Sequence, residues 1–188
     1  EEKDPYTSGH SERVCYYSDF ISKRLSLSPK ERSELQIAAY LHDIGKIGIS
    51  NRFINKKGTL TPTDWAIIKQ HTKKSIELLM PLNLSSNILS YIQHHHERYD
   101  GTGYPDGLIG EQIPLGARII AISDAYDSMT SDRPYRKPLA NGDAKNELLK
   151  NAGKQFDPKL VSLFLDVLKE MEEVFFVKDH MRVPANPY

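Results

Sequence analysis

Apolar side chains recur every three to four residues along nearly the whole chain, which is the spacing of one face of an α-helix. In the segment 8–25, for example, Val14, Tyr17 and Ile21 fall on one such face. Period-two alternation, which would indicate half-buried strands, is almost absent. The pattern therefore predicts an all-α fold, built as a compact multi-helix bundle.

Several helix starts carry their own signals. Ser28, Pro29 and Glu31 supply an N-cap, a first-turn proline and a capping box, and Gly45 is expected to end that helix. Further helices are expected from Thr61-Pro62, over 73–79, from Ser85 or Ser86, from about Leu115, from a cap at Asn141 to Asn151, and from Asp157-Pro158 to about Val174, with loops over 47–60 and 99–115.

Histidine and aspartate side chains fall on the inward faces of five of these helices. Taken singly, each would ordinarily be a hydrogen-bonded core residue or half of an ion pair. Burying them all separately would be very costly, and one shared metal centre would remove that cost. The set is too large for one tetrahedral zinc, so we expect two adjacent ions bridged by Asp43. Helical phase also directs His94 outward. The predicted ligands are His10, His42, Asp43, His71, His95, His96 and Asp124.

Composition narrows the other classes of function. The 188 residues carry 25 basic and 25 acidic side chains, so nothing favours a DNA coat or an anionic membrane surface. Cys15 is the single cysteine, which excludes an internal disulfide and fits a reducing, cytoplasmic compartment. No apolar run reaches the length of a membrane span, and we expect no membrane insertion. The chain begins without methionine and reads like a piece of a longer protein.

Two motifs carry a resemblance to a known family. His42-Asp43 is the doublet of the HD phosphohydrolase superfamily, and residues 95–101 with Gly103-Tyr104-Pro105 resemble the HHExxDGxGYP signature of its HD-GYP subgroup. The resemblance runs from about Asp4 to about Val167. It implies a bacterial signal-transduction hydrolase that cleaves cyclic di-GMP to the linear dinucleotide pGpG and, in some members, to GMP. It also implies an all-helical domain with a binuclear or trinuclear metal centre.

The resemblance carries the same seven residues over as metal ligands, with His10 the least certain because it is used most clearly in trinuclear members. Those members have a glutamate one helical turn earlier, where this chain has Tyr6. We therefore expect two divalent ions, iron or manganese in the first place, although zinc, cobalt and nickel also suit this ligand set. His10 is then either a ligand or a residue that supports one.

The resemblance also implies roles in substrate binding and catalysis. A hydroxide bridging the two metals would attack phosphorus, with Asp43 holding the ions and Lys46 neutralising the developing charge. Glu97 and Asp100 are expected to orient imidazoles. Substrate contacts are expected from Lys46, Tyr104, Arg133 and Arg136. Ordinarily, a lysine such as Lys46 would only favour the end of a helix, and the two arginines would be solvated surface charges.

Alternatives stay open at this point. The substrate could be 3'3'-cyclic GMP-AMP, or another nucleotide such as (p)ppGpp that other HD proteins hydrolyse. A non-catalytic module that senses cyclic di-GMP or docks a cyclase is a rival of another class. We expect one domain over 1–188 with a poorly ordered tail from about 178, preceded in the full protein by a sensory or receiver domain. A homodimer, and a diguanylate cyclase domain bound at the GYP loop, are the expected macromolecular partners.

Overall fold

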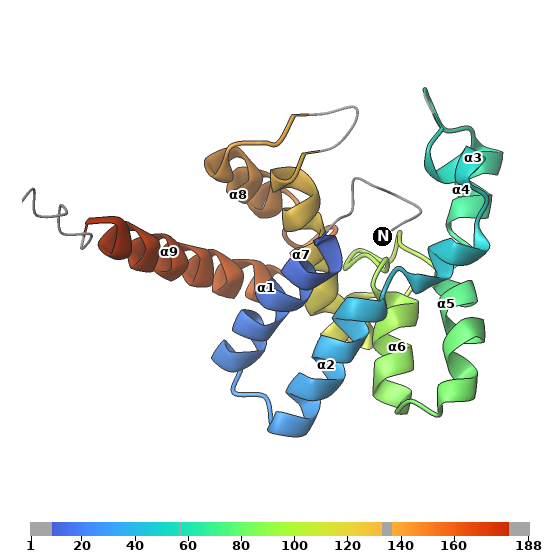
Figure 1. Cartoon of the computed structure of the whole chain (residues 1–188), viewed down its shortest axis with the longest axis horizontal. Coiled ribbons are helices and arrows are strands. Elements are labelled where there is room, and N and C mark those ends of the chain that lie inside the picture. Colours follow the sequence, from blue (N-terminus) through green and yellow to red (C-terminus); the bar gives the residue numbers. More distant parts are fainter. Residues whose placement is uncertain (1–8, 57, 133–136, 181–188) are drawn as a thin grey trace, which may run out of the picture.

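The computed structural model describes residues 9–56, 58–132 and 137–180 (Figure 1). The described residues form helices and contain no strand, which confirms the all-α prediction. The elements are α1 (His10–Arg24), α2 (Pro29–Leu41), η2 (Ile44–Gly48), α3 (Asn51–Ile54), α4 (Pro62–Ile68), α5 (His71–Leu79), η3 (Met80–Leu82), α6 (Ser86–His94), η4 (Gly110–Gln112), α7 (Leu115–Thr130), α8 (Asn141–Lys150) and α9 (Pro158–His180), where η marks a 3₁₀ turn.

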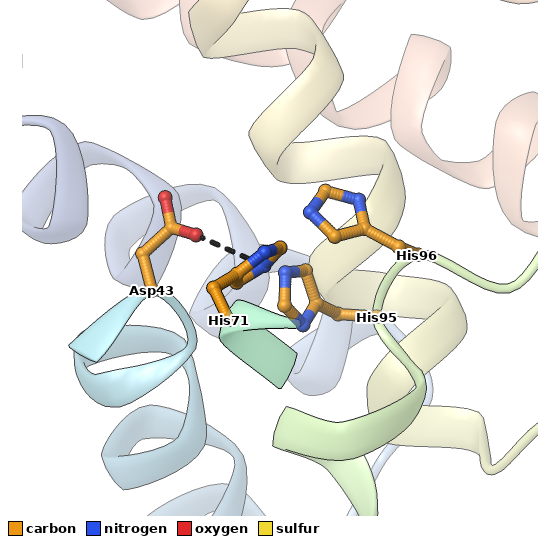
Figure 2. Close-up of side chains that lie close together, drawn as sticks. All are labelled: Asp43, His71, His95 and His96. Carbon is orange, nitrogen blue, oxygen red and sulfur yellow. Dashed lines mark ion pairs between the residues drawn. The ribbon is translucent and has the colours of Figure 1, made fainter. Parts of the chain in front are cut away.

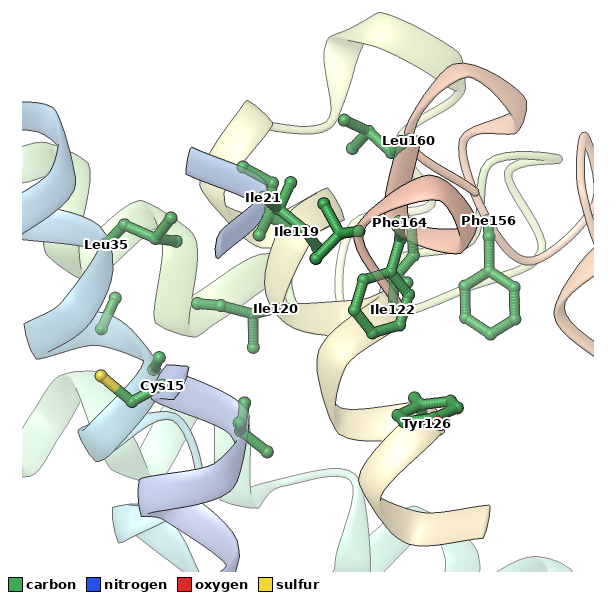
Figure 3. Close-up of a cluster of buried hydrophobic side chains, with 14 of the residues drawn as sticks. Cys15, Ile21, Leu35, Ile119, Ile120, Ile122, Tyr126, Phe156, Leu160 and Phe164 are labelled. Carbon is green, nitrogen blue, oxygen red and sulfur yellow. The ribbon is translucent and has the colours of Figure 1, made fainter. Parts of the chain in front are cut away.

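Helix α7 is the centre of the bundle, with α1, α2, α6, α8 and α9 packed around it (Figure 1). Its Ile119, Ile120 and Ile122 are fully buried, and Phe164 of α9 meets them in the same cluster (Figure 3). Burial of one such side chain stabilises the fold by about 1.5–3 kcal/mol. This core fixes the positions of the helices whose ends carry the polar residues.

The expected caps are present at most of the helix starts. At α2 the Glu31 backbone N–H donates to Ser28 Oγ over 3.3 Å, and the Ser28 N–H donates to Glu31 Oε2 over 2.8 Å. Thr61 caps α4 in the same reciprocal way, and Ser85 caps α6. At α8 the prediction is wrong by one residue, because Asn141 is the first helical residue and Ala140 precedes it. The last helix also continues past Val174 to His180.

The end of α2 differs from the prediction in a way that matters for the site. The helix ends at Leu41 rather than at Gly45, and the chain turns into η2. Gly45 lies so close to α5 that an added Cβ would sit 2.0 Å from the His71 carbonyl oxygen, and its N–H donates to Ser75 Oγ over 2.9 Å. The early end of α2 therefore lets η2 pack directly on α5. Part of the expected loop over 47–60 is also helical, in η2 and α3.

Candidate metal centre

The residues predicted as ligands come together from the starts of α1 and α5, the ends of α2 and α6, and helix α7. Their potential ligand atoms form two groups among the described residues, and within each group these atoms lie within 4.8 Å of one another. Asp43 belongs to both groups. Figure 2 shows its carboxylate facing the imidazoles that α5 and the end of α6 supply. The groups are Asp43, His71, His95 and His96, and His10, His42 and Asp43.

Three of the imidazoles are held in the same way. Nδ1 of His42, His71 and His95 lies 2.7, 2.8 and 2.6 Å from the carbonyl oxygen of the residue three positions earlier. Those carbonyls belong to the last turns of α2, α4 and α6, where carbonyl groups lack a partner within the helix. Because a carbonyl oxygen only accepts, Nδ1 must carry the proton. The lone pair of each ring is therefore on Nε2.

These lone pairs are buried without a hydrogen-bond partner among the described residues. The atoms concerned are Nε2 of His42, His71 and His95, together with Asp43 Oδ1. Such groups are rare inside proteins because each loses its hydration without replacement. Asp43 is common to the two groups of ligand atoms, with His71 and His95 in one group and His42 in the other, so a cation bound in each group would satisfy these acceptors. A mixed nitrogen and oxygen donor set of this kind fits a divalent transition metal.

The charge states also suit metal binding. Burial lowers the pKa of His95 well below its usual range and lowers the pKa of His96 to about 4, so both rings are neutral near pH 7. Burial opposes ionisation of Asp43, but the positive charge of Lys46 beside it outweighs burial and holds the pKa of that carboxyl well below its usual range. Neutral imidazoles and an ionised carboxylate are the forms that bind metals.

His10 is held differently, by side chains of α7 rather than by a carbonyl. Its Nδ1 lies 2.7 Å from Asp127 Oδ2, and its Nε2 lies 3.3 Å from Asp124 Oδ1. Burial opposes protonation of His10, but these hydrogen bonds raise its pKa to about 9. Arg13 Nε donates to the other oxygen of Asp127 over 2.5 Å. The sequence analysis missed Asp127, although its position three residues after Asp124 places it on the same face of α7.

The loop that follows His96 closes one side of the centre. The Tyr104 ring stacks on the His96 imidazole, with ring centroids 5.0 Å apart and an interplanar angle of 28°. Glu97 is 3 % exposed, and its carboxylate accepts the backbone N–H groups of residues 106, 107 and 108. Asp100 accepts from Thr102. The expectation that Glu97 and Asp100 orient imidazoles is therefore wrong, because their hydrogen bonds hold this loop together.

A cavity of about 310 Å³ opens beside these residues, and Lys46 lies on its wall with Nζ paired to Asp43 Oδ2. Tyr104 and Asp124 line the cavity too, and so does the half-exposed Trp65, which the sequence analysis did not select. His94 points away from the centre, as its helical phase predicts, and it pairs with Asp106. Tyr6, Arg133 and Arg136 lie outside the described residues, so their expected roles stay predictions.

Comparison with known proteins identifies the family. A protein named cyclic di-GMP phosphodiesterase from Thermotoga maritima is 41 % identical over 179 residues, which are 93 % of this chain and 48 % of the relative. The 3'3'-cGAMP-specific phosphodiesterase 3 of Vibrio cholerae is 35 % identical over 178 residues, 95 % of this chain and 39 % of the relative. The chain thus spans less than half the length of either relative.

A solved structure supports the fold. The HD domain of the L. monocytogenes phosphodiesterase PgpH, solved in complex with cyclic-di-AMP, superimposes on this chain with a TM-score of 0.63 at 22 % sequence identity. The match covers 97 % of this chain and 95 % of the PgpH domain. No described helix is long and apolar enough to cross a membrane. The sequence model of the HD domain matches residues 1–160. The chain belongs to the HD domain family.

Proposed function

We propose that this chain is the hydrolytic domain of a metal-dependent phosphodiesterase of the HD-GYP type, with cyclic di-GMP as its substrate and pGpG as its product; whether a second step gives GMP is decided by the product analysis below. The observation that carries the proposal is the convergence of four buried, unpartnered acceptor atoms beside an open cavity. The names of the curated relatives support a cyclic dinucleotide as the substrate class.

The two groups of acceptors fit two divalent ions that share Asp43. His71, His95 and His96 would hold one ion. His42 would hold the other, together with His10, which would release its proton when the ion binds. Asp124 lies beside His10 rather than within either group, and we assign it to the second ion. Iron or manganese is our first expectation for both positions, and this donor set also accepts zinc, cobalt or nickel.

When bound, two such ions supply Lewis-acid stabilisation of a phosphate and lower the pKa of water. The residues of the chain supply the rest. Lys46 stands at the cavity wall, where its ammonium group can neutralise negative charge that develops on the phosphoryl group. Tyr104 packs against His96 and forms part of the cavity wall. Arg133 and Arg136 would hold the second phosphate.

Hydrolysis of 3'3'-cyclic GMP-AMP is the second candidate, and the Vibrio cholerae relative favours it. A diguanylate cyclase domain docked on the loop around Tyr104, a homodimer, and an upstream sensory or receiver domain also belong to the proposal. The domain itself would span 1–188, with its tail from about 178 outside the functional part.

The test combines metal analysis of anaerobically purified protein with chromatography of the products from both cyclic dinucleotides. In the Asp43→Ala variant, metal content and turnover should fall together to background, because Asp43 contributes to both groups of ligand atoms. Asp166→Ala is the matched control, since this carboxylate is exposed on α9 far from the site in sequence. Normal turnover of cyclic di-GMP by Asp43→Ala would contradict the proposal, and metal bound by the wild type without product would favour a binding module.

A further inference from the structure

A second hollow adjoins the metal centre, and Tyr104 lines this hollow as well as the first cavity. Its volume is about 460 Å³, and it shares Trp65, His96, Tyr104 and Asp124 with the first cavity. A ligand can therefore reach the same metal centre while it occupies both hollows. A cyclic dinucleotide has two bases on one ring of two phosphates, so a second base subsite is required if the proposed function holds.

The walls of the second hollow suit a flat purine. Ala121 and Ala125 of α7 supply small apolar side chains to its lining, and Tyr104 and Trp65 supply aromatic rings. Aromatic side chains beside a flat apolar surface stack on nucleobases without regard to sequence. Stacking alone would accept guanine and adenine equally. Any choice between them must come from the polar groups of the hollow.

Two of those polar groups, Arg98 and Gln155, are held in position by hydrogen bonds and carry donor N–H groups. Arg98 Nε donates to Thr102 Oγ1 over 2.9 Å, and its Nη1 donates to Gln155 Oε1 over 3.1 Å. A contact of 3.4 Å joins Nη2 to Asp100 Oδ2. Three of the five guanidinium N–H groups are engaged in this way, and two are left for a ligand.

The orientation of the Gln155 amide follows from the same contact. Because a guanidinium only donates, the Gln155 atom that faces Arg98 must be the oxygen, and the –NH₂ group faces the other way. The carboxylates nearby are already engaged. Glu97 accepts three backbone N–H groups, and Asp124 is paired with His10 and Ser128. Lys69 adds positive charge over the Tyr104 ring, 4.9 Å from its centroid.

We propose that Arg98 and Gln155 read the second base of the substrate and select guanine at this subsite. Guanine presents two acceptors, O6 and N7, on the edge that two donors can meet, whereas adenine replaces O6 with the donor N6. Adenine would therefore bring its amino group against the Arg98 and Gln155 donors. One such mismatched pair lowers binding roughly 10- to 100-fold.

The test uses Gln155→Glu in the metal-loaded protein. Glutamate keeps an oxygen for Arg98 and replaces the outward –NH₂ with an acceptor. For cyclic di-GMP we expect KM to rise roughly 10- to 100-fold while kcat stays within about threefold, because Gln155 is not among the residues around the reacting phosphate. Cyclic di-AMP should not lose kcat/KM. Gln155→Ala should raise KM for cyclic di-GMP without the gain of an acceptor, and the exposed neighbour Lys154→Ala is the control.

A second readout separates this proposal from the proposed function. Trp65 is the single tryptophan and lines both hollows, so its fluorescence reports ligand binding. The wild type should bind GMP more tightly than AMP, and Gln155→Glu should remove that difference. The carboxylate introduced by Gln155→Glu repels the phosphates of GMP and AMP equally. The difference between the affinities for the two nucleotides therefore reports only the contacts to the base. Absence of cyclic dinucleotide hydrolysis by the wild type would overturn only the proposed function. An unchanged KM in both Gln155 variants, or an unchanged GMP-to-AMP ratio, would overturn the guanine subsite.

Discussion

Replacing Glu97 by glutamine tests what holds Tyr104 against the metal centre. The carboxylate is buried, with Oε1 accepting the N–H groups of Asp106 and Gly107 over 2.7 and 3.1 Å and Oε2 accepting that of Leu108 over 3.2 Å. Glutamine has almost the same shape. It keeps one oxygen for two of these N–H groups, and its –NH₂ group would face the third.

The cost follows from the three bonds. Hydrogen bonds to a charged acceptor contribute about 1.5–3 kcal/mol each and those to a neutral one about 0.5–1.5 kcal/mol, so the two retained bonds weaken. The third N–H of the loop is left facing a donor, at a cost of about 1–3 kcal/mol. Relief from burying a charge offsets part of the sum. We expect Glu97→Gln to lower the free energy of unfolding by about 2–4 kcal/mol, which is roughly 5–15 °C in Tm for a chain of this size.

The assay compares denaturant unfolding, metal content and kinetics of the same preparations. Because Glu97 holds the loop and not an imidazole, metal content should be unchanged while KM for cyclic di-GMP rises and amide exchange over 99–109 speeds up. Glu111→Gln is the matched control, since its exposed carboxylate pairs with Lys159 at the surface and the change should stay within about 0.5 kcal/mol. A Glu97→Gln protein as stable and active as this control would refute the reasoning. If Glu97→Gln lost metal while amide exchange over 99–109 stayed slow, Glu97 would act on a metal-binding imidazole and not on the loop.

Two further substitutions test how the helix ends build the site. Asp127→Asn should weaken metal binding about 10- to 100-fold in a chelator competition, because the carboxylate that fixes His10 becomes a neutral amide; Asp166→Asn is its control, and equal affinities would contradict the role. Gly45→Ala should destabilise the fold by about 3 kcal/mol or more in denaturant unfolding, because its Cβ would meet backbone of α5. Gly142→Ala is the control, since a Cβ there meets nothing within 4 Å, and equal effects of the two changes would be evidence against the close approach.

The part of the site that the sequence could predict is the part governed by local geometry. His42, His71 and His95 stay in phase with the apolar face of a helix, so periodicity alone brings them inward. The same reasoning turns His94 outward, where it pairs with Asp106. Capping residues predict most helix starts for a similar reason, because Ser28 and Glu31 are only three residues apart and interact within one turn.

The rest depends on residues that are distant in the chain. Gly45 was expected to end a helix, and its actual constraint is the backbone of α5 some thirty residues later. Glu97 stands beside two histidines in sequence, and yet its carboxylate turns to a loop about ten residues on. Asp127 acts across 117 positions on His10. Composition ignores sequence position, and periodicity relates only residues that lie within a few turns of one helix. Neither can therefore predict a contact between residues that are far apart in the chain.

The helix ends therefore contribute to the chemistry as directly as the histidines do. A carbonyl in the middle of a helix is occupied by the N–H four residues later, and it is free only in the last turn. Because α2, α4 and α6 end where they do, Ala39, Ile68 and Ile92 each offer a free oxygen that fixes an imidazole proton on Nδ1. One residue inserted before His42 would rotate the following side chain by about 100° and break this arrangement. The positions at which these helices end therefore fix the tautomer of the three histidines, and with it the ring nitrogen that is left to bind a metal.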